Sequence, residues 1–328
     1  MKKDFYWAIL KRIASSILVL FLLVTFIFLL VRLAPGDPSQ KFLSPQLSPE
    51  LANKVYQSFG LDKPVYQQYF AFIANLFTGD FGISYNYRLP VVSVIKDYFL
   101  FTLIFSSISL IIQLTLGYYL AKTAYRNEGK ILDRILSSSS IIMFSVPAFI
   151  VGLILIYIFS VQLDLLPTSG IKSDYYNDLN FFERVKDYFI HLILPMITLS
   201  VAGIAVFFKY LRDNFAVIAN QSFITNLKAS GLSDKEIFRH HILPNAIQPL
   251  ISIAGIEFGI LLGGALITEV IFALPGMGRL TISAIFSRDF PLVIGCAFIT
   301  GLMMIISNLI ADLIKIKFDR RLIKDLIT

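Results

Sequence analysis

The chain contains few side chains whose type and spacing suit catalysis. His240 and His241 are adjacent, so on a helix they would point about 100° apart and be poorly placed to share a metal ion. The sequence shows no acidic pair, no metal-ligand spacing and no Ser/His/Asp grouping for nucleophilic chemistry. It also lacks the Gly-x4-Gly-Lys-Ser/Thr loop that binds nucleotide phosphates, and Gly276-x-Gly278 has no preceding strand and no following lysine. We therefore expect a non-catalytic chain with no metal and no cofactor of its own.

Glu257 is the residue whose surroundings most suggest a function. It is the only Asp, Glu, Lys or Arg within the six long apolar segments of the chain, and an ionisable group at membrane depth is a functional candidate by default. It lies among Gly255, Gly259 and Gly263, whose four-residue spacing suits close helix packing at a pore or a subunit interface. Two interpretations stay open: contact with the amino group or cation of a substrate, or a neutralised or hydrogen-bonded structural group.

The composition places the chain in a membrane. Of its 328 residues 56% are hydrophobic and 16% charged, against about 25% charged in soluble domains. The net charge is +7, but the basic residues lie between apolar runs rather than in one stripe, which favours a lipid bilayer over nucleic acid as the partner. The single cysteine, Cys296, excludes a disulfide framework and a cysteine-rich metal site.

Six segments are apolar and long enough to cross a bilayer, since about 20 residues span its hydrocarbon core. The first is too long for a signal peptide and has no small-x-small cleavage site after it, so we expect it to remain as a helix. Prolines in or near the ends of the spans, at Pro147, Pro195, Pro249 and Pro291, can kink them. The predicted fold class is an all-α polytopic membrane protein with six transmembrane helices, at residues 13–31, 98–121, 135–161, 190–208, 246–268 and 290–311.

Lysine and arginine are concentrated on one side of this predicted bundle. Segments 1–12, 122–134, 209–239 and 315–328 together carry 18 of the 29 Lys and Arg residues, although the opposite loops are longer in total. The positive-inside rule therefore predicts that both termini are cytoplasmic. We expect a multi-pass protein of the inner (cytoplasmic) cell membrane.

The first outer loop, 35–97, is long enough to fold as a small helical extracytoplasmic cap. Ser48-Pro49-Glu50 can begin one helix that Gly60 would end. A second helix is predicted from about Pro64 to Phe77, ending at Thr78-Gly79-Asp80. The cap could be a docking surface for an external partner or a spacer that shields the outer mouth.

The inner loop, 209–244, contains the clearest local signals. Residues 213–230 suit a helix, and Gly231 can end it in a left-handed conformation. Ser233 and Glu236 then fit the capping box of a new short helix, with Leu232 and Ile237 at the hydrophobic-staple positions. Such a helix could be a lever presented to a soluble partner, or an amphipathic segment on the inner leaflet.

The spacing from Gly231 to Leu243-Pro244 resembles the loop signature of ABC importer permeases, Glu-Ala-Ala-x3-Gly-x9-Ile-x-Leu-Pro. The glycine and the Leu-Pro pair agree with that signature. The opening triplet is replaced by Thr225-Asn226-Leu227, and His241 stands at the isoleucine position. The turn therefore agrees with the family, and the side-chain contacts of the triplet do not.

A second resemblance covers nearly the whole chain. Segment 269–280, followed by Ala284-Ile285 and by residues 288–291, is similar to the stretch before the last span of dipeptide, oligopeptide and nickel importer permeases. Four further motifs occur in the order of that family, at residues 34–38, 60–64, 79–82 and 166–170. The large first outer loop is similar to that of one of the two paired permeases of the family.

The resemblance implies the transmembrane domain of a type I ABC importer. Its parts would be the N-terminus and first helix (1–34), the cap (35–97), a five-helix core (98–314) with the coupling loop 209–244, and a cytoplasmic tail (315–328). It implies a second homologous permease, two ATP-binding subunits that hold ATP and Mg, and an extracytoplasmic solute-binding protein. It implies import by alternating access, most simply of di- or oligopeptides, although nickel chelates, glycosidic derivatives and peptide antibiotics also fit the pattern. The alternative is a self-contained channel or proton-coupled transporter that uses Glu257.

Two groups of candidate site residues follow from these local patterns together with the resemblance. The ATPase-coupling group comprises Thr225, Asn226, Leu227, Ala229, Gly231, Leu232, Ser233, Glu236, Ile237, Leu243 and Pro244. The candidate pore or interface group comprises Glu257, Glu269, Pro275, Gly276, Gly278, Arg279, Arg288 and Asp289.

Overall fold

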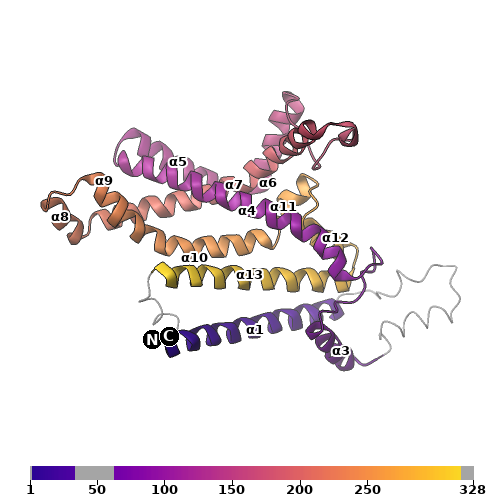
Figure 1. The fold of residues 1–328 in the computed structure, drawn as a ribbon. Coiled ribbons are helices and arrows are strands. Elements are labelled where there is room, and N and C mark those ends of the chain that lie inside the picture. The colour runs from indigo at the N-terminus through magenta and orange to yellow at the C-terminus, as the bar shows by residue number, and fades with distance from the viewer. Residues whose placement is uncertain (1, 34–62, 319–328) are drawn as a thin grey trace.

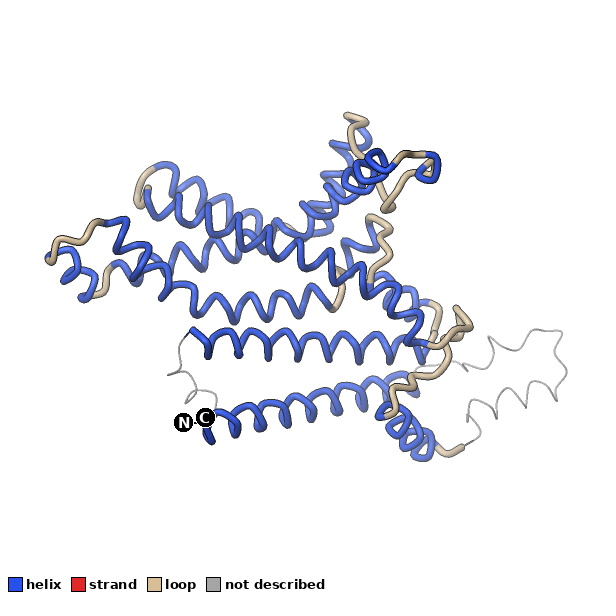
Figure 2. Tube along the Cα trace, viewed as in Figure 1, coloured by secondary structure: helices blue, strands red, loops and turns tan. Residues whose placement is uncertain are grey.

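The computed structural model describes residues 2–33 and 63–318, and the regular elements within these ranges are all helices (Figures 1 and 2). The long helices are α1 (Lys2–Leu33), α4 (Val91–Arg126), α7 (Phe181–Ala219), α10 (Leu243–Leu262) and α13 (Phe290–Phe318). The shorter ones are α3 (Val65–Phe77), α5 (Ile131–Ser145), α6 (Ala148–Leu155), α8 (Ser222–Ala229), α9 (Asp234–Ile237), α11 (Leu266–Ile271) and α12 (Met277–Phe286). Two π-helical segments, η2 (Ile156–Gln162) and η4 (Phe238–Ile242), and the 3-10 turn η3 (Tyr176–Asp178) complete them. The predicted all-α membrane fold is confirmed.

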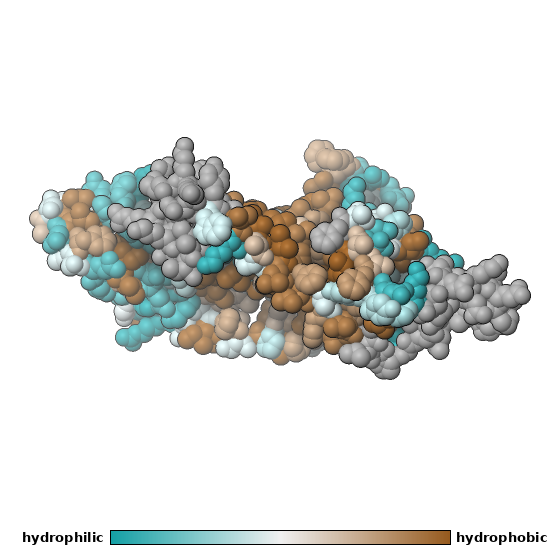
Figure 3. Space-filling model, turned by 90° about the horizontal axis from the view of Figure 1, so that it is seen from below, coloured by the Kyte–Doolittle hydropathy of each residue, from teal (hydrophilic) through white to brown (hydrophobic). Residues whose placement is uncertain are grey.

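The long helices lie side by side, so that the connections gather at two ends (Figure 1). The α4–α5 turn, α8 and α9 lie at one end, which we call the α9 end, together with the start of α1 and the end of α13. Residues 78–90, 163–180 and 272–289 lie at the other, the α12 end. Apolar residues form a band between hydrophilic ends (Figure 3), as expected for a chain that crosses a bilayer.

The third predicted span is not one straight helix. The chain breaks after Ser145, and α6 with η2 leaves α5 at an angle of 99°. Pro147 causes the break, because it has no backbone N–H to continue α5 and it forces Val146 into an extended conformation (ψ 122°). The described part of the chain therefore holds five candidate spans and this bent pair.

The fifth predicted span, 246–268, also ends earlier than expected. Helix α10 stops at Leu262, and Gly264, with φ +101°, turns the chain into α11. A β-carbon at Gly264 would collide with the backbone of Gly278, so this turn requires glycine.

The small-residue spacing on α10 serves the predicted close packing. Gly255, Gly259 and Gly263 face Ala311, Met304 and Thr300 of α13, respectively. Glu257 is not on that ridge, contrary to our expectation. It lies two positions from both Gly255 and Gly259, which at 100° per residue places it on the opposite side of α10.

The second helix of the predicted cap is present as α3, and Gly79 follows it with φ +76°. Helix α3 packs on α1, where the Phe28 and Phe72 rings stack with centroids 5.4 Å apart and the Thr25 and Tyr69 hydroxyls lie 2.8 Å apart. The first predicted cap helix, at 49–60, lies outside the described residues.

A seam of small and polar residues joins α4 to α7. Ser109 of α4 lies 3.0 Å from Ser200 Oγ, the Gln113 side chain fills the space beside Gly203, and Gly117 leaves room for Phe207. In a lipid bilayer the hydrophobic effect contributes little to helix association, because the lipid is as apolar as the side chains. Close packing and hydrogen bonds therefore hold α4 and α7 together.

Candidate functional site

The α9 end carries a helix–turn–helix that the sequence predicted in part. The expected single helix over 213–230 is instead the end of α7 and the separate helix α8, with a break at Asn220-Gln221. Gly231 has φ +85°, which confirms the predicted left-handed turn. The capping box is also confirmed: Ser233 Oγ accepts a hydrogen bond from Glu236 N (3.3 Å), and Glu236 Oε2 accepts one from Ser233 N (3.0 Å).

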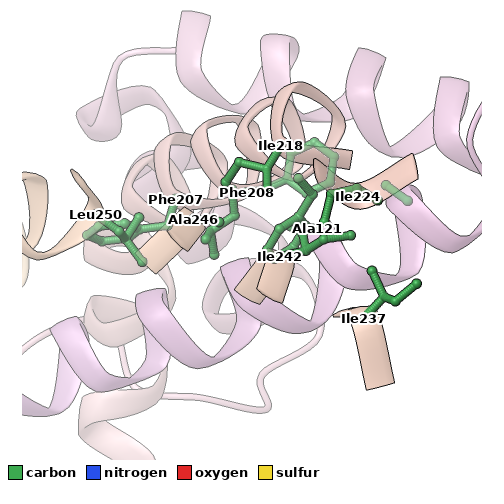
Figure 4. Close-up of a cluster of buried hydrophobic side chains, with 12 residues drawn as sticks. Ala121, Phe207, Phe208, Ile218, Ile224, Ile237, Ile242, Ala246 and Leu250 are labelled. Carbon is green, nitrogen blue, oxygen red and sulfur yellow. The ribbon is translucent and has the colours of Figure 1, made fainter. Parts of the chain in front are cut away.

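A buried apolar cluster fixes α8 and α9 to the long helices (Figure 4). Ile224 of α8 and Ile237 of α9 are each 1% exposed. They join side chains of α4, α7, η4 and α10, namely Ala121, Ala124, Phe207, Phe208, Leu211, Phe215, Ile218, Ile242, Ala246 and Leu250. Full burial of each isoleucine stabilises the attachment by about 1.5–3 kcal/mol. The cluster therefore packs α8 and α9 together with α4, α7 and α10 in one unit.

The predicted coupling residues divide between this cluster and the surface. Ile237 is buried, and Leu227 and Leu243 are partly buried against the cluster. The others are exposed: Pro244 at the start of α10, and a surface of mixed polarity on α8, the turn and α9 that comprises Thr225, Asn226, Ala229, Gly231, Leu232, Ser233 and Glu236. On this surface the apolar side chain of Leu232 lies beside the polar residues Ser233 and Glu236.

Sequence reasoning missed an ion pair between α7 and α5, in which Asp133 is buried and Arg212 partly buried. Arg212 of α7 donates from Nε and Nη2 to Asp133 of α5, at 3.1 and 2.9 Å, in a bidentate pair. Gly129 N also donates to the Asp133 carboxylate (3.1 Å), so the pair holds the α4–α5 turn against α7. The sequence did offer a signal for this pair, because Asp133 lies shortly before the predicted span 135–161 and Arg212 lies shortly after the predicted span 190–208.

At the α12 end, Glu269 is fully buried and binds the start of α12. Its carboxylate accepts hydrogen bonds from Gly278 N (2.7 Å), Arg279 N (3.0 Å) and Thr102 Oγ1 (3.1 Å). Thr102 Oγ1 in turn accepts a hydrogen bond from Met277 N (2.8 Å). The first three N–H groups of α12 are thus satisfied by α11 and α4, and the negative charge lies at the positive end of the helix dipole.

Gly276 and Gly278 are required by this arrangement. A β-carbon at Gly276 would overlap the Glu269 carboxylate, and one at Gly278 would lie 2.7 Å from Leu266 Cα. Among the candidate pore or interface residues, Gly276 and Gly278 therefore allow the close packing around Glu269.

Asp289 is also fully buried and ties the loop 82–90 to α13. It caps α13 by accepting from Leu292 N (3.3 Å), and its other oxygen accepts from Ser84 Oγ (2.5 Å) and Asn86 N (2.9 Å). In the same loop, burial and the hydrogen bond to Tyr98 raise the pKa of Tyr87 to about 12, so that its phenol stays neutral.

The remaining candidates at this end are more exposed. Arg279 donates from Nη1 to the Ala273 carbonyl (2.5 Å), across the turn that contains half-buried Pro275. Arg288 is exposed, with φ +51°.

The structure does bring a serine, an aspartate and a histidine together, in the loop 163–180 and α7. Asp187 accepts from Ser173 N (2.9 Å) and from the Ser173 hydroxyl, and His191 Nδ1 lies 2.8 Å from the Asp187 carbonyl. The serine is bonded to the aspartate rather than to the histidine, so the three residues do not form a Ser–His–Asp triad. The group holds the loop 163–180 to α7.

Glu257 is half-buried on α10 and makes no hydrogen bond or ion pair with any residue in the described ranges. An acid at membrane depth without a protein partner is open to a ligand, a second subunit or water.

These features define a class of protein. Helices long and apolar enough to span a membrane, joined by a buried apolar cluster to short helices at one end, are those of a polytopic membrane protein. The family of the binding-protein-dependent transport system inner membrane component matches residues 113–324, and the N-terminal component of the same transport systems matches residues 5–106. The chain belongs to this family, and the predicted resemblance to ABC importer permeases is confirmed.

Relatives of known name align over almost their whole length. The chain is 33% identical to the probable peptide ABC transporter permease protein y4tP of Sinorhizobium fredii, over 96% of this chain and 98% of that protein. It is 32% identical to the glutathione transport system permease protein GsiC of Escherichia coli K12, over 93% of this chain and 95% of that protein. The crystal structure of an amino acid ABC transporter with histidines has the same fold, with a TM-score of 0.52 and 18% identity over 69% of this chain and 94% of the other.

Proposed function

We propose that this chain is one of two permease subunits that form the pore of an ATP-driven importer for di- or oligopeptides. The family and the near full-length alignment to permeases named for peptide and for glutathione transport support this function. Two ATP-binding subunits hold ATP and Mg, and an extracytoplasmic binding protein delivers the peptide.

The attachment of α9 to the buried cluster is the observation that carries the mechanism. An ATPase subunit docks on the exposed residues of α8, the Gly231 turn and α9. When the ATPase pair closes, α9 moves with it, and the cluster transmits that movement to α4, α7 and α10. Access to the pore then changes from one side of the membrane to the other.

This mechanism requires the α9 end to be cytoplasmic. The excess of basic residues in segments 1–12, 122–134, 209–239 and 315–328 supports that orientation and places both termini inside. The loops of the α12 end then face the binding protein.

Within this function Glu257 is the candidate for contact with the peptide amino group. A half-buried acid with no partner in the described part of the chain can attract a cation without first breaking an ion pair. The competing function, a self-contained proton-coupled transporter, would use the same residue but would not need ATP.

Single-cysteine labelling tests both the orientation and the docking surface. The buried Cys296 is first replaced by serine, and Ser233→Cys in the α9 cap is compared with Asp174→Cys at the α12 end. We expect a membrane-impermeant thiol reagent to label intact cells at position 174 and not at 233. A short cross-linker should join position 233, and not 174, to an ATPase subunit. Labelling at 233 from outside, or peptide uptake that survives ATP depletion, would contradict the proposal.

A further inference from the structure

A basic groove lies between the end of α4 and α9. It encloses about 760 Å³, a size typical of small-molecule sites. Tyr118, Tyr125 and Phe238 line it on one side, and the cations around it are Lys122, Arg126, Lys228, Lys235 and Arg239. Its two carboxylates are Glu128 and Asp234, so the lining carries a net charge of about +3.

The cations of the groove are mostly uncompensated. Within the described ranges only Lys228 forms an ion pair, with Asp234 at 3.5 Å. Lys122 is half-buried, and its Nζ lies 5.4 Å from the Tyr118 ring centroid and 5.7 Å from that of Phe238. The two rings hold the ammonium group in place and leave its positive charge available to an anion.

The groove lies beside an exposed aromatic side chain of α4. Tyr119, one turn from Lys122, is 59% exposed, and its ring centroid lies 5.3 Å from that of Tyr118, which lines the groove. Ile237, Ile242 and Leu243 give the groove an apolar wall. A ligand that fits this site therefore has an anionic part for the lysines and an apolar part for α4.

We propose that the groove binds the phosphate of an anionic phospholipid of the inner leaflet, with an acyl chain along Tyr119 of α4. The inner leaflet is the natural source, because Lys122 directly follows the uncharged segment 98–121 of α4 and anionic headgroups attract basic residues beside a span. This placement rests on the proposed cytoplasmic side of the α9 end. The lipid bridges α9 and α4 at the surface of the bundle, next to the buried cluster that joins the same two helices in the core.

Lipid binding is measured on the purified importer complex, so that it does not depend on transport. The complex is reconstituted with a fluorescent phosphatidylglycerol in phosphatidylcholine, and the bound lipid is quantified by energy transfer and after extraction. The double variant Lys122→Ala/Arg126→Ala is compared with Lys209→Ala, which removes a cation at the same end that is paired with Asp213 outside the groove.

We expect the groove variant to weaken phosphatidylglycerol binding by roughly 30-fold, because each basic residue at a membrane surface contributes a factor of about five. The Lys209 variant should bind normally, Lys122→Arg should retain most of the binding, and inorganic phosphate should not compete. Binding that is unchanged in the groove variant overturns the proposal. So does competition by inorganic phosphate, which would indicate a soluble ligand. Loss of ATPase assembly with normal lipid binding would assign the groove to an acidic segment of that subunit.

Discussion

Replacement of Glu269 removes the acceptor that three hydrogen-bond donors share at the start of α12. The donors are Thr102 Oγ1, Gly278 N and Arg279 N, and the carboxylate is fully buried. Each buried donor left without an acceptor costs about 1–3 kcal/mol, so Glu269→Ala should destabilise the subunit by roughly 3–9 kcal/mol. Glu269→Gln keeps the shape but replaces charge-assisted bonds with neutral ones, which should cost about 2–3 kcal/mol.

Thermal unfolding of the purified importer in detergent measures this loss, and peptide uptake reports its effect on transport. Glu257→Gln is the matched control, since it makes the same change on α10 where the carboxylate has no described partner. We expect a lower Tm for the Glu269 variant only. Thr102→Val combined with Glu269→Gln should be less destabilising than the sum of the two changes, because the residues share a bond. Wild-type Tm and uptake for Glu269→Gln would refute the capping role.

Three further predictions concern the α9 end and the pore. Asp133→Asn removes the bidentate partner of Arg212 and should cost about 1.5–3 kcal/mol in thermal unfolding, with part of the loss recovered in Asp133→Asn/Arg212→Gln; an unchanged Tm would speak against the pair. Gly231→Val has free space for its side chain but forces a branched residue to φ +85°, so ATP-dependent uptake should fall while membrane insertion stays normal. Gly231→Asn should be milder, and equal uptake by the valine variant would remove the turn from the coupling mechanism. Glu257→Gln should weaken uptake of peptides with a free amino terminus more than of N-acetylated ones, and an equal effect on both would assign Glu257 a structural role.

Short sequence patterns predicted the parts of this fold that depend on residues close together in the chain. The apolar segments gave the helices, and the Ser233 cap and the Gly231 turn gave the shape of the α9 end. Pro147 indicated a kink, but the angle of 99° depends on how α6 packs against α7 and α11. The periodicity of the sequence does not indicate which helices pack against each other.

The internal networks could not be predicted because their members are far apart in the chain. Glu269 was a pore or interface candidate from its motif, yet its partner Thr102 is 167 residues away. Asp289 is 205 residues from Ser84. In both cases the sequence identified the acid, while its role as a helix cap depends on which helices are neighbours in space.

The π-helical segment Phe238–Ile242 lies between two α-helical segments, α9 and α10. A π turn holds one more residue than the α-helical turn that it replaces. Deletion of a single residue there would leave one continuous α-helix, rotated by about 100° and shortened by about 1.5 Å at α9. Ile237 would then leave the buried cluster, and the face that α9 presents to the outside would change. One surplus residue thus sets the phase of α9 relative to α10, and a relative that lacks it would offer its partner a different side of the same helix.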